Sequence, residues 1–162
     1  LKDYFVSDGK ITEDAQREGE YTRMLAGRIV EEYHRINRIF GSHLVAFVAF
    51  EMFQRMHPKL DLFGLLRLPE DELVISYDEF RAAFKKVRKQ VYKLKKAGKA
   101  NHASHVKGKA DEVIRRGIEN TGIFHLKRPL LTDKTGNIIT QDLNLLYYYH
   151  NRLVGYGLER FI

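Results

Sequence analysis

The stretch from Leu44 to Phe50 constrains the fold more than any other part of this sequence. All seven residues of Leu44-Val45-Ala46-Phe47-Val48-Ala49-Phe50 are apolar, so a helix that contains them is apolar on nearly every side. Such a helix must be enclosed by other elements. Ser42 can cap it and Pro58 ends it, which predicts a central core helix over His43–His57. The surrounding run without charged residues is well short of the roughly 20 residues that a membrane-spanning helix needs.

Apolar residues at spacings of three and four predict further helices around this core. A long amphipathic helix should begin near Thr12-Glu13-Asp14, and its stripe consists of Tyr21, Leu25, Ile29, Tyr33, Ile36 and Phe40. The other helices are predicted over Asp61–Arg67, Tyr77 to about Ala97, Ala110 to about Asn120, and Gln141 to about Val154. Their expected start and stop signals are a Ser76/Glu79 capping box, a Gly122 cap and a Thr140 cap. The polar segment Lys99–Lys109 is expected to be a mobile loop.

The β signal is small and lies late in the chain. Ile123–Leu131 and Asn137–Ile139 are expected to form two short strands around the turn Asp133-Lys134-Thr135-Gly136. The sequence therefore predicts a mainly α fold, one helical domain over residues 1–162 with one small β-hairpin. Because the hairpin follows one helix and precedes another, a winged-helix-like arrangement is the alternative.

No catalytic, cofactor or metal site is predicted. The turn at Asp133 resembles the phospho-aspartate motif of ion-pumping ATPases, but that chemistry needs a further Lys and paired acids on a parallel α/β sheet downstream, so a turn with a positive φ at Gly136 is the favoured interpretation. His102 and His105 would need at least one more ligand to hold a metal, and Asp111 is the nearby candidate. The chain has no Cys, which favours a reducing, cytoplasmic compartment.

The positive charge is local. The chain carries a net charge of +7, yet residues 77–116 alone contain 13 Lys and Arg against 4 Asp and Glu. Most of these cations fall on the predicted helix from Tyr77 to about Ala97. The candidate anion-binding or partner-binding residues are Arg81, Lys85, Lys86, Arg88, Lys89, Lys93 and Lys96. The alternative is that Phe80, Phe84, Val87, Val91 and Leu94 form a packing seam and the cations are only its solvated outer face.

Two segments of the chain resemble a known family. Arg28-Ile29-Val30, Ile36-Asn37-Arg38 and Leu44-Val45-Ala46 resemble a passage in the C-terminal half of bacterial glycerol-3-phosphate acyltransferases. Leu146-Tyr147-Tyr148-Tyr149-His150-Asn151-Arg152-Leu153 is similar to a Leu-x-x-Tyr-Tyr-Arg-Asn-Asn block near the end of the same family. The order and rough spacing of the two segments agree with the family. The resemblance implies that nearly the whole chain corresponds to the C-terminal region of such an enzyme.

The resemblance places the chemistry outside this sequence. The family's catalytic motif is His, four residues, then Asp, and none of the seven His here has Asp five positions later; His57 and Asp61 are one residue short. The family's Phe-Pro-Glu-Gly and Arg-rich motifs are also missing. We therefore expect a non-catalytic accessory domain, with a catalytic domain upstream of Leu1. The residues expected to contact that domain are Asn37, Arg38, Tyr148, Tyr149, Asn151 and Arg152.

The family implies acyl transfer to glycerol phosphate at the inner membrane surface, in phospholipid biosynthesis. The expected partners of the basic helix are then an anionic membrane surface or an acidic acyl carrier protein, with peripheral attachment to the membrane's inner face. A winged-helix nucleic-acid binder is the alternative function. In that architecture the helix before the hairpin should enter the groove, and Asp111, Glu112 and Glu119 on it oppose the phosphates. Nucleic acid is therefore the less favoured partner.

Overall fold

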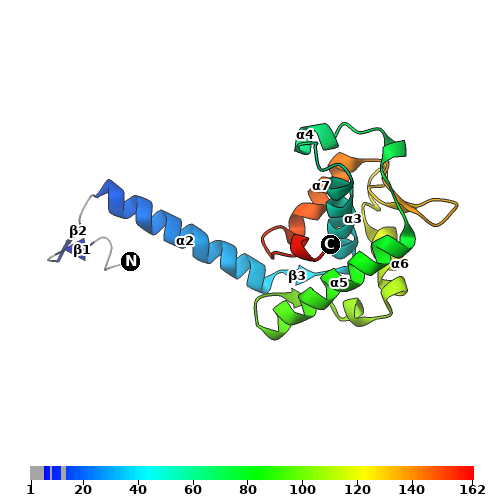
Figure 1. Ribbon diagram of the computed structural model, residues 1–162. Coiled ribbons are helices and arrows are strands. Elements are labelled where there is room, and N and C mark those ends of the chain that lie inside the picture. The colour runs from blue at the N-terminus through cyan, green and yellow to red at the C-terminus, as the bar shows by residue number, and fades with distance from the viewer. Residues whose placement is uncertain (1–5, 8, 12–13) are drawn as a thin grey trace. The chain divides into compact units, whose positions relative to one another are not determined.

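The computed structural model of the chain describes residues 6–7, 9–11 and 14–162 (Figure 1). These residues belong to two compact units, Leu1–Ile36 and Asn37–Ile162. The prediction that residues 1–162 act as one domain of a larger enzyme stays a prediction. The chain is mainly helical, as the sequence predicted, and the predicted hairpin belongs to a three-stranded antiparallel sheet of short strands.

The first unit contains the long amphipathic helix α2, Ala15–Ile36, and the short antiparallel pair β1, Val6–Ser7, with β2, Lys10–Ile11. Asp14 caps the helix, since its Oδ1 accepts the backbone N–H of Gln16 at 3.0 Å. The predicted start at Thr12-Glu13 lies outside the described residues. The helix ends at Ile36 and not at Phe40, because residues 38–39 form a strand.

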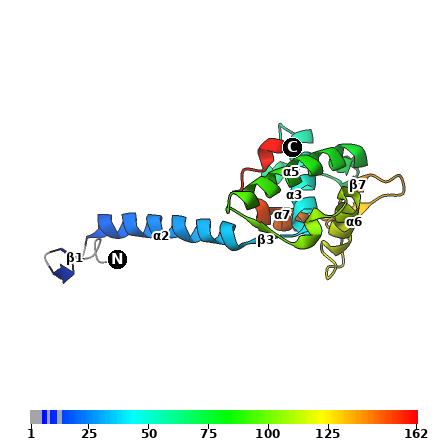
Figure 2. The same ribbon diagram turned by 90° about the horizontal axis from the view of Figure 1, so that it is seen from below.

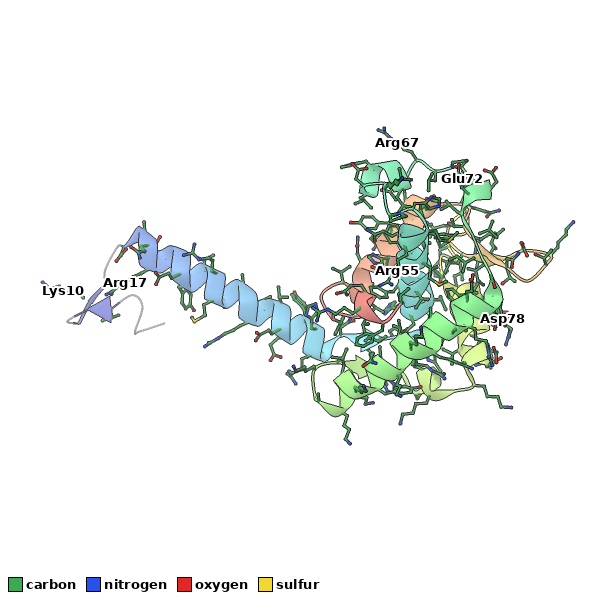
Figure 3. The ribbon with its side chains drawn as sticks, in the orientation of Figure 1. Lys10, Arg17, Arg55, Arg67, Glu72 and Asp78 are labelled. Atoms are coloured by element: carbon green, nitrogen blue, oxygen red, sulfur yellow. The ribbon has the colours of Figure 1, made fainter. Side chains whose placement is uncertain are left out.

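The predicted core helix is confirmed as α3, Gly41–Met56, and it packs against α5, α6 and α7 (Figure 1). Every residue from Leu44 to Phe50 is buried. The helix begins before Ser42, which caps nothing; the Nδ1 atom of His43 instead accepts the N–H of Phe40 at 3.4 Å. Near its other end, Arg55 donates to the carbonyl oxygens of Glu159 and Ile162 at 2.7 and 2.5 Å, which fixes the C-terminal segment onto α3 (Figure 3).

The remaining predicted helices are present with small changes at their ends. They are α4, Leu62–Leu65; α5, Tyr77–Lys96; α6, Ala110–Asn120; and α7, Leu143–His150. Two predicted caps were wrong. Ser76 makes no capping hydrogen bond at the start of α5, and Asp142 caps α7 in place of Thr140 by accepting the N–H of Leu145 at 2.9 Å. Short 3₁₀ turns follow at η1, Glu70–Glu72; η2, Ser104–Lys107; η3, Asn151–Leu153; and η4, Glu159–Phe161.

The hairpin is smaller than predicted but is extended by another strand. Strand β6, Leu131–Thr132, pairs with β7, Ile138–Ile139, and β7 also pairs with β4, Val74–Ile75, so the sheet order is β4-β7-β6. Residues 123–130 form no strand; they are a loop between α6 and β6. The predicted order of a helix, a hairpin and a final helix is thus present as α6, β6–β7 and α7 (Figure 2).

The segment Lys99–Lys109, expected to be only a loop, carries structure. Strand β5, Asn101–His102, pairs in parallel with β3, Arg38–Ile39. His102 and Val106 are buried, and the hydroxyl of Tyr92 on α5 donates to the carbonyl of Val106 at 2.8 Å. The segment therefore joins α5 to the start of α3.

Candidate functional site

Five lysines form one exposed face of α5, and we call them the lysine face: Lys85, Lys86, Lys89, Lys93 and Lys96. Spacings of three and four hold them on the side of the helix opposite its buried residues, which are Phe80, Ala83, Phe84, Val87 and Val91. None of the five makes an ion pair or a side-chain hydrogen bond with a described residue. Their charge is therefore uncompensated and open to an anionic partner.

The two arginines of the predicted basic set lie beside this face and are engaged inside the protein. Arg81 binds the carboxylate of Asp111 on α6 through two nitrogens, with Nη2 to Oδ2 at 3.0 Å. Arg88 donates to the carbonyl of Gly108 at 2.8 Å and lies over the rings of Phe84 and Tyr92. Both arginines hold α5 against its neighbours, so the five lysines are the part of the predicted set left for binding.

Asp111 is the acid that joins α5 to α6. It accepts hydrogen bonds from Arg81 and from the hydroxyl of Tyr77 at 3.0 Å. These bonds, with Arg81 as the larger cause, lower the pKa of Asp111 to about 2. Burial, and then the hydrogen bond to Asp111, raises the pKa of Tyr77 to about 12. Asp111 is thus committed to this contact and does not offer the third metal ligand that His102 and His105 would need.

The two histidines of that candidate metal site are also engaged separately. His102 is buried, with Nδ1 2.9 Å from the carbonyl oxygen of Ala103. The Nε2 atom of His105 accepts the N–H of Gly41 at 3.2 Å. In the part of the chain that the structure describes, no three His, Asp or Glu side chains are grouped to hold a metal ion.

Asp133 forms a turn, as its sequence context favoured. Its Oδ1 accepts from the N–H and hydroxyl of Thr135 at 2.8 and 2.7 Å and from the N–H of Asn137 at 2.9 Å. Gly136 has a φ of 93° in this turn. The hydrogen bonds, led by the Thr135 hydroxyl, lower the pKa of Asp133.

Within the second unit, Asn37 of the first resembling segment contacts the end of the second one. The Asn37 side chain donates to the carbonyl of Arg152 at 3.4 Å and to the hydroxyl of Tyr156 at 3.2 Å. Arg38 is exposed on β3, and Asn151 and Arg152 are exposed just after α7. Four of the six predicted interdomain residues therefore belong to these two adjoining segments.

The other two, Tyr148 and Tyr149, lie on α7. Tyr148 is 67% exposed, and its ring meets that of Tyr149 edge-on at 5.5 Å. Tyr149 in turn lies 6.2 Å from the ring of His125. Half-exposed aromatic rings of this kind can bind a further surface, which is compatible with the predicted contact.

His43 gives a pH dependence. Burial, with the positive charge of Arg152 as a second cause, lowers the pKa of His43 to about 4 from 6.5. Between pH 6.5 and 4 the His43 ring is protonated in the unfolded chain but neutral in the folded protein. The free energy of unfolding should therefore fall as the pH decreases through this range. The full shift corresponds to about 3 kcal/mol, and partial exposure reduces the expected loss to about 2 kcal/mol.

This prediction can be measured directly. An NMR titration should follow the His43 ring, and the unfolding free energies of the wild type and of His43→Asn should be compared across the same pH range. The variant should lose less stability between pH 6.5 and 4 than the wild type does. A ring that titrates near its ordinary value would contradict the prediction.

Two features of the molecule were missed by sequence reasoning. Nε2 of His150, which is 5% exposed, lies 2.8 Å from a carboxylate oxygen of Glu51 in the core. Phe124 and Leu126 are almost fully exposed on the loop after α6. The first pair is 99 residues apart in the sequence, so no local pattern indicates it.

No protein-family model, curated protein or solved structure matches the chain. Within the described residues, no helix combines the length and apolar character needed to cross a bilayer. The acyltransferase relationship and the cytoplasmic location therefore stay predictions.

Proposed function

We propose that this chain is the accessory C-terminal region of a glycerol-phosphate acyltransferase, in which the lysine face binds an anionic partner near the catalytic domain. The observation that carries the docking role is the set of five exposed lysines on one helix, none of which has a side-chain partner among the described residues. The acyltransferase assignment rests on the resemblance of the two segments that meet at Asn37 and Arg152. The reaction itself belongs to a His-x-x-x-x-Asp domain outside this sequence.

An anionic lipid surface is the first expected partner. Each Lys near such a surface contributes roughly 1 kcal/mol, and the contribution weakens with salt. Three lysines together are then worth about 100-fold in partitioning. An acidic acyl carrier protein is the second expected partner, because it presents the same charge. Nucleic acid is not proposed: on α6, Glu112 and Glu119 already pair with Arg115, and Glu112 also pairs with Arg116.

The test is a charge reversal on the lysine face. The variant Lys85→Glu/Lys86→Glu/Lys89→Glu should bind vesicles of phosphatidylcholine and phosphatidylglycerol at least about 100-fold more weakly than the wild type in a sedimentation assay. Its matched control is Lys59→Glu/Arg67→Glu/Lys134→Glu, which makes the same change in net charge at exposed positions elsewhere. The control should lose clearly less affinity.

The same proteins should be titrated with acyl carrier protein. Loss of carrier binding in the α5 variant, without a difference in vesicle binding, would assign the lysine face to the carrier. Equal binding by the α5 variant and the control, to vesicles and to carrier alike, would refute the docking role. The acyltransferase assignment is tested separately by the coding sequence upstream of Leu1, which should contain a His-x-x-x-x-Asp motif.

A further inference from the structure

The loop between α6 and β6 is closed at its base. Gly122 has a φ of 70°, and a Cβ atom placed there would lie 2.4 Å from the Cδ atom of Pro129. The two ends of the loop are therefore in direct contact, and only glycine fits at the first of them. The guanidinium of Arg128 also donates to the carbonyls of Ile118 and Glu119, at 3.3 and 2.5 Å. These contacts fix the base of the loop to the end of α6.

The tip of this loop is apolar and exposed. Phe124 is 95% exposed and Leu126 is fully exposed, more than any other large apolar side chain in the described part of the chain. Between them, the His125 ring packs edge-on against Tyr149 of α7. In Figure 2 the loop projects from the body of its unit beyond the end of α6. Two large apolar side chains are therefore held in water by a loop whose base is fixed, and because they are not buried they do not stabilise the fold.

The charge around the tip is positive. No Asp or Glu occurs between Asn120 and Thr132, whereas Lys127 follows the tip directly. Lys127 is exposed and has no ion-pair partner among the described residues. The exposed ring of Tyr148 belongs to α7, against which the loop packs through His125. Segments that enter the interface of an anionic bilayer typically combine apolar side chains with an adjacent lysine and tyrosine rings, as this loop does.

We propose that this loop inserts Phe124 and Leu126 into an anionic lipid bilayer, with Lys127 at the level of the phosphates. The tip favours a lipid partner over a protein partner. In a protein–protein interface, central apolar residues such as these are surrounded by further contact surface that excludes water, and a narrow projecting loop offers little of it. A bilayer needs only that the two side chains pass the headgroups. The loop tip shares no residue with the lysine face, so this proposal does not depend on whether that face binds lipid.

The test uses the absence of tryptophan from the chain, which makes an introduced Trp a clean reporter. In Phe124→Trp, anionic vesicles should shift the emission to shorter wavelength, and lipids brominated on their acyl chains should quench it. The matched control is Phe63→Trp on α4, where the native side chain is 71% exposed. The control emission should stay unchanged and unquenched. Vesicle-bound Phe124→Trp protein without quenching would overturn the proposal.

A second variant measures the contribution of the tip. Phe124→Ser/Leu126→Ser should weaken partitioning into anionic vesicles by at least about tenfold, because two large apolar side chains no longer leave water. Circular dichroism should show an unchanged fold, since neither side chain is buried. Unchanged partitioning would overturn the proposal. So would an emission of the Phe124→Trp variant that shifts with protein concentration in the absence of lipid, because a second copy of the chain would then cover the loop.

Discussion

Replacement of His150 by Ala should lower the free energy of unfolding by about 3–5 kcal/mol. The ring is enclosed by aromatic side chains. It stacks on the ring of Phe47, with 5.0 Å between the ring centroids and 3° between the ring planes, and its centroid lies 4.6 Å from that of Phe50. Its removal leaves a cavity between these rings. It also leaves the carboxylate of Glu51, whose side chain is only 14% exposed, without its partner at 2.8 Å. Urea unfolding of the purified chain measures the loss.

Two further variants separate the causes of this loss. Glu51→Gln keeps a carbonyl oxygen that can accept the Nε2 proton, so it should cost about 1–2 kcal/mol. His125→Ala removes an exposed histidine together with its edge-on contact to Tyr149, and should cost no more than about 1 kcal/mol. Equal losses for Glu51→Gln and His150→Ala would show that the charge, and not the packing of the ring, dominates. A loss below about 1 kcal/mol for His150→Ala would contradict the buried pair.

The helices and the core were predictable because their signals are local. The apolar run Leu44–Phe50 required an enclosed helix, and all seven of these residues are buried in α3. The caps were less predictable, since several side chains near a helix start can compete for the same N–H groups. Thr140 was predicted as the cap of α7, but its hydroxyl accepts the N–H of Asp142, and Asp142 takes the capping position.

The hairpin β6–β7 was predicted, but the pairing of β4 with β7 and of β3 with β5 was not, because each strand is two residues long and its partner is distant in the sequence. Ile75 pairs with Ile138, and Ile39 pairs with His102. Within the segment Ile123–Leu131, β-branched and aromatic residues favoured a strand. The contact of Gly122 with Pro129 instead closes this segment into a loop. Steric contacts of this kind override residue propensity and leave little trace in the pattern.

The candidate site was predictable only where its signal is local in the sequence. The lysine face follows from helical spacing alone, and its five members are exposed. The internal roles of Arg81 and Arg88 were not foreseen, because their partners Asp111 and Gly108 lie 30 and 20 residues away. The exposed tip at Phe124 was missed because its residues resemble those of a buried strand. In this sequence the exposed apolar tip was therefore harder to recognise than the charged lysine face.

Replacement of Gly117 by Ala should destabilise the chain by about 3 kcal/mol, although Ala favours a helix by about 1 kcal/mol over Gly. Gly117 lies where α6 crosses the start of α3, and a Cβ atom there would meet the carbonyl oxygen of Gly41 at 2.9 Å and a methyl of Val45 at 2.8 Å. The first contact is backbone, so the two helices must separate to admit the methyl group. Chemical denaturation measures the loss.

Gly27 in α2 provides the opposite case for the same substitution. Nothing lies within 4 Å of a Cβ atom placed there, so Gly27→Ala removes only the entropic cost of a glycine in a helix interior. It should raise the helix content measured by circular dichroism and leave the unfolding of residues 37–162 unchanged. If both substitutions stabilised the chain, the close approach of α6 to α3 would be wrong. Opposite signs at two helical glycines would show that packing at Gly117, and not helix propensity, decides the outcome.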